Sequence, residues 1–336
     1  MGQRFRKRAN IAKNYVTGKL RCAEFAITNA CIAKCTFCDI WKQRPKVFTD
    51  KGKTLRAIDR LSELGVSHMT FTGGEPLLHP DIISFVERAT SNRINNSVLA
   101  AAPRLVLRDD TPARLEQAGC DLLCLSFDSG DPKTMAASRG IDGIMADMEL
   151  AIEAVKRTRL KTMASVLIWN DNYDRLGEVC QSALGMGFDF ISFNYPTFSL
   201  SGVYELGGEG VSLPRESVAD ALEAAIELKR SNKYPIVNSV VSMRNIIDYL
   251  RGPGTARFPC HGGRRVFFVD WFFDVRPCMQ LPDVLGNVLS IEGKDLCRAP
   301  CNQCSMSWYR DFSTLFCGAR SAPALFEGLS RSGGLL

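Results

Sequence analysis

Three cysteines lie close together near the start of the chain, spaced C-x3-C-x2-C behind a short apolar run. They are Cys31, Cys35 and Cys38, and this spacing lets all three thiols reach one centre. Thiolates are the usual protein ligands of iron–sulfur clusters, and a four-iron cluster normally takes four of them. Because the loop supplies three, a cluster bound here keeps one iron open. The alternatives are half of a zinc site and three buried cysteines without metal, but zinc favours further cysteines or histidines, and the chain has 3 histidines.

A glycine-rich turn, Gly73-Gly74-Glu75-Pro76, follows the next predicted strand. Two glycines let the backbone approach a ligand closely, and the carboxylate of Glu75 can accept hydrogen bonds from an ammonium group. The same four residues could form an ordinary turn. Their place one strand after the three cysteines favours a shared ligand site instead.

Together the two motifs resemble the signature of the radical S-adenosylmethionine (SAM) superfamily. In that family a 4Fe-4S cluster on three cysteines binds the methionine part of SAM at its open iron, and the reduced cluster cleaves SAM to a 5′-deoxyadenosyl radical. The resemblance implies that Cys31, Cys35 and Cys38 hold this cluster. It also implies cofactor contacts from Phe37, Gly73, Gly74, Glu75, Pro76, Ser126, Asp128, Arg139 and Asn170.

Within that resemblance the contacts have separate roles. Phe37 is expected near the adenine, the glycine-rich turn at the methionine amine, and Ser126 and Asp128 at the ribose. Arg139 resembles the arginine that many members aim at the methionine carboxylate, since its planar fork suits that group, and Asn170 is a weaker candidate of this type. The alternatives are a strand-end serine, a turn aspartate and a surface arginine. One departure is 100–103, Ala-Ala-Ala-Pro, where many relatives have Thr-Asn-Gly.

The C-terminal third carries a second group of cysteines, which resembles the twitch domain, a shortened SPASM domain with one auxiliary 4Fe-4S cluster. Four of them match its ligands: Cys260, Cys278, Cys301 and Cys304. Cys297 and Cys317 are left as spare or substitute ligands. Arg310 stands where the full SPASM pattern has a further cysteine, and Phe273 replaces its glycine, so one auxiliary cluster is expected rather than two. A zinc site on Cys297, Cys301, Cys304 and Cys317 is the alternative.

Strand and helix patterns alternate through the first two thirds of the chain. Strands are expected at 22–28, 67–72, 96–101, 121–127, 161–168 and 189–194, and helices at 49–64, 81–90, 112–118, 141–157, 173–186 and 212–232, the last with Ser212 as N-cap. This order predicts an α/β fold with a parallel sheet. The resemblance implies a partial, TIM-like (β/α)6 barrel followed by a small cysteine-rich iron–sulfur domain, whereas periodicity alone also fits an open doubly wound sheet.

Three regions are therefore expected: a basic leader at 1–20, a radical SAM core at 21–235 and an auxiliary-cluster domain at 236–336. The leader is either a basic amphipathic helix that contacts a membrane or an anionic partner, or, as is more frequent, a solvated helix packed on the barrel edge. A net charge of +6 over 336 residues does not indicate nucleic-acid binding. With no apolar signal segment and 13 cysteines, a reducing, cytoplasmic location is expected.

These observations predict an enzyme of oxidoreductase or lyase type. It is expected to abstract hydrogen from a small-molecule substrate, such as a natural product, sugar, lipid or macrocycle, with net oxidation through the auxiliary cluster. An external one-electron reductant such as flavodoxin or ferredoxin would supply the electron. The alternative is a SPASM-type peptide or protein maturase, and a more remote one is a zinc- or metal-binding protein without catalysis.

Overall fold

The structure is a computed structural model that describes residues 2–196, 212–252, 258–302 and 304–317. Its centre is a parallel sheet in which the first six strands lie side by side in chain order, from β1 to β6. The strands are β1 Arg21–Ala26, β2 Val66–Thr72, β3 Asn95–Ala100, β4 Leu122–Ser126, β5 Lys161–Leu167 and β6 Phe190–Asn194. The predicted α/β fold with a parallel, partly closed barrel is confirmed.

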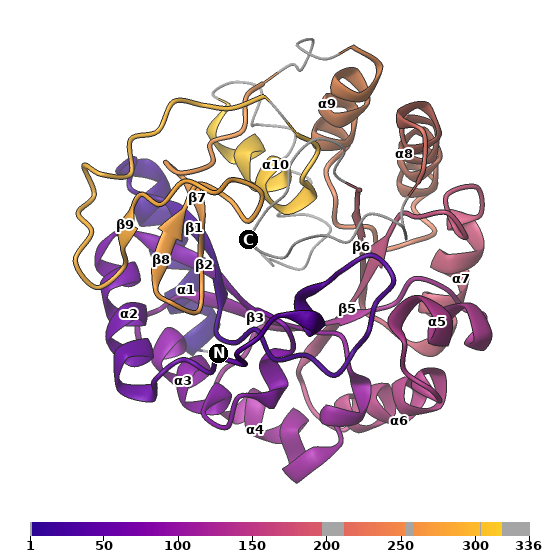
Figure 1. The fold of residues 1–336 in the computed structure, drawn as a ribbon, viewed down its shortest axis with the longest axis horizontal. Helices are drawn as coiled ribbons and strands as arrows, with labels where there is room; N and C mark the ends of the chain where they lie inside the picture. The colour runs from indigo at the N-terminus through magenta and orange to yellow at the C-terminus, as the bar shows by residue number, and fades with distance from the viewer. Residues whose placement is uncertain (1, 197–211, 253–257, 303, 318–336) are drawn as a thin grey trace.

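Helices surround these strands on the outside of the barrel (Figure 1). Those that follow the predicted alternation are α2 Lys51–Glu63, α3 Ile82–Ser91, α4 Thr111–Gln117, α6 Ile144–Lys156, α7 Leu176–Met186 and α8 Arg215–Arg230. Not predicted were α5 Pro132–Arg139, α9 Val240–Arg251, α10 Ser307–Ser313 and the single-turn 3-10 helices η1 Ile40–Lys42, η2 Pro76–Leu78, η3 Pro103–Leu105, η4 Arg108–Asp110 and η5 Thr314–Phe316.

The predicted N-cap of the last core helix is wrong. Helix α8 begins at Arg215, with Pro214 in the N-cap position, so Ser212 lies outside it. The Ser212 hydroxyl instead accepts a hydrogen bond of 3.2 Å from the Asn170 side-chain amide, and its backbone N–H donates to the same residue at 3.1 Å. Serine side chains form hydrogen bonds readily with nearby polar groups, and Ser212 bonds with Asn170 instead of capping the helix.

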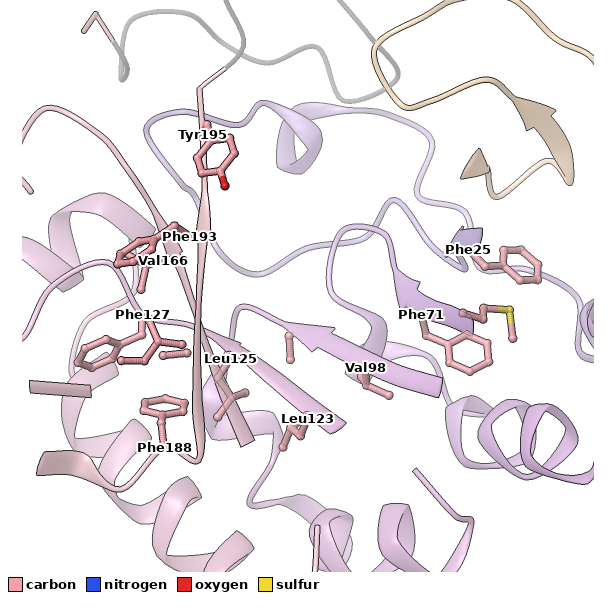
Figure 2. Close-up of a cluster of buried hydrophobic side chains, with 14 of the residues drawn as sticks. Phe25, Phe71, Val98, Leu123, Leu125, Phe127, Val166, Phe188, Phe193 and Tyr195 are labelled. Carbon is pink, nitrogen blue, oxygen red and sulfur yellow. The ribbon is translucent and has the colours of Figure 1, made fainter. Parts of the chain in front are cut away.

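Alternation along the strands separates an apolar outer layer from the barrel lumen. Phe25, Phe71, Val98, Leu125 and Phe193 belong to the outer layer, which Figure 2 shows as a continuous set of buried side chains across the sheet. The neighbouring positions along the strands point to the other face and line a cavity in the lumen; they include Glu24, Thr70, Ser97, Ser165 and Asn194. The lumen is therefore much more polar than the packed outer layer.

The C-terminal segment extends the same sheet. Strand β7 Val266–Val269 pairs in parallel with β1, and β8 Asp274–Arg276 and β9 Gly286–Asn287 add antiparallel strands beyond it. Helix α10 contacts both β6 and β7, so it bridges the side on which the six-stranded barrel is open. The boundary predicted near residue 235 stays a prediction, because the segment beyond it shares a sheet with the barrel.

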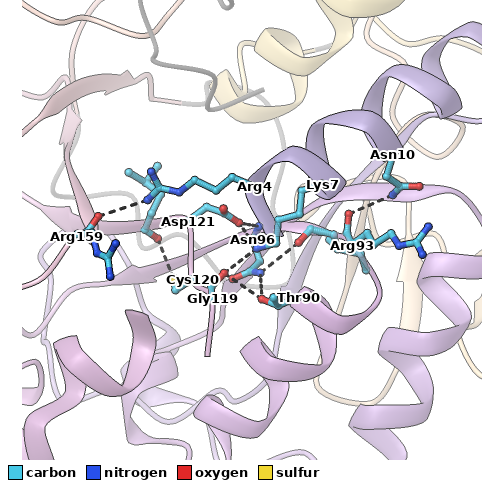
Figure 3. A network of polar contacts seen from close by, with 12 residues as sticks. Arg4, Lys7, Asn10, Thr90, Arg93, Asn96, Gly119, Cys120, Asp121 and Arg159 are labelled. Atoms are coloured by element: carbon cyan, nitrogen blue, oxygen red, sulfur yellow. Dashed lines mark hydrogen bonds and ion pairs between the residues drawn. The ribbon is translucent and has the colours of Figure 1, made fainter. Parts of the chain in front are cut away.

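Helix α1, Gly2–Val16, packs against β2 and β3 instead of standing apart as a basic arm. Lys7 is 2% exposed, donates to the Gly119 carbonyl at 2.7 Å and pairs with Asp121 at 2.5 Å. Figure 3 shows this network, in which Asn10 also donates to the Arg93 carbonyl. The structure therefore matches the packed-helix alternative for the leader. Among the described helices, none has the length and apolar character needed to cross a bilayer.

We expect Lys7→Met to lower the free energy of unfolding by about 3 kcal/mol, because it leaves the Asp121 carboxylate without its buried partner. Urea denaturation of the variant and of the wild type measures this. Arg4→Met is the control, since Arg4 makes one exposed 3.4 Å contact, and it should change stability by less than about 0.5 kcal/mol. Recovery of part of the loss in Lys7→Met/Asp121→Asn would show the coupling, and equal effects of Lys7→Met and Arg4→Met would contradict it.

Candidate active site

The three-cysteine loop follows the C-terminal end of β1, the edge at which (β/α) barrels carry their functional groups. Side-chain hydrogen bonds between the loop and the segment 45–47 hold both of its ends in place. The Asn29 carboxamide donates to the Pro45 carbonyl at 3.0 Å and accepts from the Val47 N–H at 2.7 Å. Lys46 donates to the Ile40 and Trp41 carbonyls, which holds the chain just past Cys38. The returning segment therefore clamps both ends of the loop.

The C-terminal end of α5 supports the middle of the same loop. The N–H groups of Lys34 and Thr36 donate to the carbonyls of Arg139 and Ser138, at 2.9 and 3.1 Å. These acceptors are the free carbonyls that a helix end presents. Gly140 ends the helix with φ of 59°, and a Cβ there would lie 2.7 Å from the Lys34 carbonyl oxygen, so both its conformation and its packing require glycine.

The glycine-rich turn lies directly against the residues that lead into the loop. The N–H of Gly74 donates to the Thr28 carbonyl at 2.8 Å, and the N–H of Glu75 donates to the Ala30 carbonyl at 2.7 Å. A Cβ on Gly73 or on Gly74 would come within 2.2 Å of those two carbonyl oxygens, respectively. The two glycines are therefore needed for backbone packing, whatever they contact in a ligand.

Glu75 is fully buried, and its carboxylate accepts three backbone hydrogen bonds. One oxygen accepts from the Leu77 N–H at 3.0 Å, and the other accepts from the N–H groups of Ala101 and Ala102 at 2.7 and 2.9 Å. Burial raises the pKa of Glu75 to about 7, and the three N–H donors lower it in part. The unusual alanines after β3 thus supply backbone donors, and Glu75 ties the glycine-rich turn to them.

A cavity of about 330 Å³, called here the cofactor cavity, lies at the strand ends. Most of the predicted cofactor and cluster residues line it. Those on its wall are Cys31, Cys35, Phe37, Cys38, Gly73, Gly74, Ser126 and Arg139. Glu75, Pro76 and Asp128 lie behind the wall and are buried. Asn170 is not on this wall, and its amide is paired with Ser212. Direct contact of these four residues with a cofactor stays a prediction.

Arg139 connects the cluster loop to the barrel. Its guanidinium contacts Asp128 at 2.6 Å, lies 3.8 Å from the Cys35 sulfur and stands 5.0 Å from the centre of the Phe37 ring. The second oxygen of Asp128 accepts from the Leu167 N–H at 2.9 Å. Asp128 is therefore engaged on both oxygens, and within the described chain it positions Arg139 beneath the loop.

The chemistry of the loop thiols fits a positively charged metal cluster. Burial raises the pKa of Cys31 to about 12 and that of Cys38 to about 11, so they stay protonated unless positive charge is bound between them. Metal binding displaces such protons. In the ranges that the structure describes, no three His, Cys, Asp or Glu side chains converge as they would around a single metal ion. The fit to a cluster thus rests on the donor chemistry and on the shared cavity.

The structure also brings the C-terminal cysteines together. Cys260 and Cys301 face each other across a pair of backbone hydrogen bonds of 2.7 and 2.9 Å. The buried Cys304 lies close enough to Cys260 and Cys278 to raise the pKa of both thiols. Cys297 is exposed. The Cys317 thiol donates to the Ser313 carbonyl at 3.2 Å. Which of these cysteines hold a metal stays a prediction.

Sequence reasoning missed two buried charged residues. Arg310, noted as a departure from the SPASM pattern, is fully buried, and its guanidinium donates to the Cys304 and Phe258 carbonyls at 3.1 and 3.0 Å. Glu24 lies on β1 and is 4% exposed, on the wall of both the cofactor cavity and a second cavity of about 200 Å³ in the lumen. An acidic residue within an otherwise apolar strand, Cys22 to Ala26, was the available signal.

Comparison with known proteins agrees with this geometry. Residues 25–183 match the family model described as Radical SAM superfamily. This segment is a radical SAM domain. The matched segment runs from β1, through the cysteine loop and the glycine-rich turn, to α7.

Curated relatives of this chain include two kinds of cyclase. A "PqqA peptide cyclase" of Granulibacter bethesdensis is 26% identical over 163 residues, which cover 48% of this chain and 43% of that protein. A "GTP 3′,8-cyclase" of Streptomyces coelicolor is 30% identical over 144 residues, which cover 39% of this chain and 42% of that protein. The matches thus span less than half the length of either relative.

Among solved structures, Streptococcus suis SuiB bound to precursor peptide SuiA superposes with a TM-score of 0.63 at 15% identity. The superposition covers 94% of this chain and 70% of SuiB. At this identity the likeness shows the fold alone, and it extends beyond the matched domain into the C-terminal segment.

We expect Gly74→Ala to reduce the iron bound after anaerobic reconstitution towards about half of the wild-type amount, because its Cβ would displace the Ala30 carbonyl and with it the start of the cysteine loop. Iron per chain is the measurement. Gly177→Ala, a helical glycine whose Cβ would meet nothing closer than 3.7 Å, is the matched control and should bind wild-type iron. Equal iron in both variants would show that the close packing of the turn does not matter for the loop.

Proposed function

We propose that this radical SAM chain cleaves SAM reductively at a 4Fe-4S cluster on Cys31, Cys35 and Cys38 and uses the resulting radical to modify a peptide. The observation that carries the cofactor part is the shared cavity. Three cysteines, the glycine-rich turn, Ser126 and Arg139 come from the ends of strands β1, β2 and β4 and from the end of helix α5, and they meet on one wall. No other described cavity gathers three thiols in this way.

When bound, the reduced cluster supplies the electron that splits SAM, and the chain's own residues position the reactants. The turn at Gly73 and Gly74 offers backbone at the cavity wall, which suits the methionine amine. Arg139 brings positive charge to the edge of the loop, held by Asp128. Phe37 presents an aromatic face, packed at 6.0 Å between ring centres against Trp169, which suits an adenine.

A peptide is the substrate class that the comparisons favour. The matched relative of Granulibacter bethesdensis is named for a peptide, and the SuiB structure holds a precursor peptide. We therefore place the peptide reading, considered second from the sequence, ahead of the small-molecule reading. A small-molecule substrate remains the second candidate because of the match to a GTP 3′,8-cyclase.

An auxiliary cluster on Cys260, Cys278, Cys301 and Cys304 would give the reaction a site for removing an electron from the substrate. What supports this role is the position of these cysteines. Helix α10 follows Cys304 directly and contributes Ser307 and Trp308 to the wall of the cofactor cavity. The second group of cysteines is thus linked to that cavity by a few residues of chain. We further propose a flavodoxin- or ferredoxin-type donor as the external reductant.

Iron, sulfide and SAM cleavage in one preparation test the cofactor part. Anaerobically reconstituted protein should hold about eight irons per chain, and Cys31→Ala/Cys35→Ala/Cys38→Ala should hold about four and form no 5′-deoxyadenosine under reducing conditions. Cys180→Ala, a buried cysteine in α7 away from both groups, should keep the wild-type iron content and cleavage. Zinc in place of iron, or cleavage by the triple variant, would overturn the proposal.

A second measurement addresses the substrate class. Formation of 5′-deoxyadenosine is followed with a pool of synthetic peptides, with GTP and without additive, since radical SAM cleavage that is coupled to a substrate is faster when that substrate is present. We expect at least about threefold stimulation by peptides and none by GTP. Stimulation by GTP alone would return the small-molecule reading to first place.

A further inference from the structure

The lumen cavity adjoins the cofactor cavity and shares part of its wall. Glu24, Leu99, Ser165, Asn194, Ser307 and Trp308 line both. The cavity volume of about 200 Å³ is well above the roughly 30 Å³ that one water molecule occupies in the liquid. A side chain of several heavy atoms can therefore extend from the cofactor cavity into the lumen.

The wall of this cavity is apolar along its sides and polar in places. Leu99, Leu122, Met163, Trp308 and Phe312 supply the apolar part. Polar groups on the same wall include the Glu24 carboxylate and the hydroxyls of Thr70 and Ser97. The two hydroxyls form a hydrogen bond of 2.9 Å with each other. An apolar channel with a carboxylate suits a ligand with an aliphatic stem and a polar head.

Glu24 has hydrogen-bonding capacity left over. Its Oε2 atom is buried and has no hydrogen-bond partner among the described residues. Burial raises the pKa of Glu24 to about 7, and the Tyr309 hydroxyl lowers it in part. A buried polar atom without a partner is destabilising, and a ligand that donates to it removes that cost.

The charges around the lumen are unbalanced. Among the described residues that line the two cavities, Arg139 is the only lysine or arginine, and it is engaged with Asp128. Burial lowers the pKa of His68 to about 4, so its ring is neutral at physiological pH. Asp311, from α10, adds a second carboxylate to the lumen wall. The lumen therefore presents acidic groups and no free cation on its described wall.

We propose that the lumen cavity binds the cationic side chain of a lysine or arginine residue of the substrate, with the Glu24 carboxylate as its partner. The inference rests on the proposed peptide-modifying function and narrows its substrate class. The ammonium or guanidinium group donates charge-assisted hydrogen bonds to Oε2 of Glu24, and the aliphatic stem packs along Leu99 and Trp308. Because those two residues also line the cofactor cavity, the peptide backbone attached to the bound side chain lies at that cavity.

Two other roles for Glu24 make different predictions. A protonated Glu24 that donates to a neutral substrate group gives no preference for a cation. A Glu24 that serves only as the partner of Tyr309, anchoring α10, gives no ligand binding in the lumen at all. Comparison of a charged probe with its uncharged isostere distinguishes these roles from the proposal.

The test is calorimetric titration of reconstituted, SAM-loaded protein with Nα-acetyl-L-lysine N-methylamide and with the norleucine analogue, which has the same stem without the charge. We expect the wild type to bind the lysine probe at least about tenfold more tightly. Glu24→Gln should remove the preference. Glu87→Gln, the same change at an exposed position of α3, should retain it.

Equal affinities for the two probes in the wild type, or no binding of either, would overturn the inference even if Glu24→Gln failed to fold. A lysine preference that survives in folded Glu24→Gln would overturn the role of Glu24. Formation of 5′-deoxyadenosine, measured on the same wild-type preparation, separates this inference from the proposed function. If SAM is not cleaved, the proposed function fails; if it is cleaved without a lysine preference, the cation site alone fails.

Discussion

The site depends on one close backbone contact, between the end of β1 and the turn that follows β2. Two N–H groups of the glycine-rich turn donate to the carbonyls of Thr28 and Ala30, just ahead of the first cysteine of the loop. Parallel pairing of β1 with β2 sets the separation of the two segments, and glycine lets them meet. Once this contact forms, the direction of the cysteine loop, the place of Glu75 and the floor of the cofactor cavity follow.

Most of the buried charged side chains around that contact stabilise neighbouring parts of the fold. Asp128 holds Arg139, Glu75 collects three backbone donors, Lys7 fastens α1 to the strand starts, and Arg310 lies behind the C-terminal cysteines. Each of these groups has its partners within the protein, as buried charges require. Arg310 and Glu24 each keep one buried atom without a hydrogen-bond partner in the described chain, but Glu24 lies on a cavity wall and Arg310 does not. That difference separates a group that supports the fold from a group available to a ligand.

Much of the fold could be predicted because its signals are local. Apolar runs and turn residues placed the six core strands within about two residues, and parallel order follows from their alternation with helices. Two of the helices that were missed, α5 and α10, are short. Helix α10 is seven residues long, and the structure buries Tyr309 and Arg310 on one side while Trp308 and Phe312 stack with His68 on the other. A helix enclosed in this way has no polar face to reveal its period.

The parts of the site that depend on the spacing of motifs along the chain could be predicted. The hydrogen-bond and ion-pair partners of its side chains could not. The cysteines and the glycine-rich turn could be placed together from order along the chain. That Asp128 binds Arg139, or that Asn170 pairs with Ser212, depends on distances across the barrel that no sequence window contains. Glu24 was detectable in principle as a charge within an apolar strand, but its meaning required the lumen around it.

The position of α10 has a consequence for how the protein is made. This helix bridges β6 and β7 and forms part of the wall of both cavities, yet it follows all the described strands in chain order. During synthesis the barrel strands emerge first, and the lumen stays open at its side until residues 307–313 have left the ribosome. The cysteine loop therefore stays accessible from the side of the lumen over an interval in which the lumen cavity does not yet exist, and the cavity closes only once α10 has emerged.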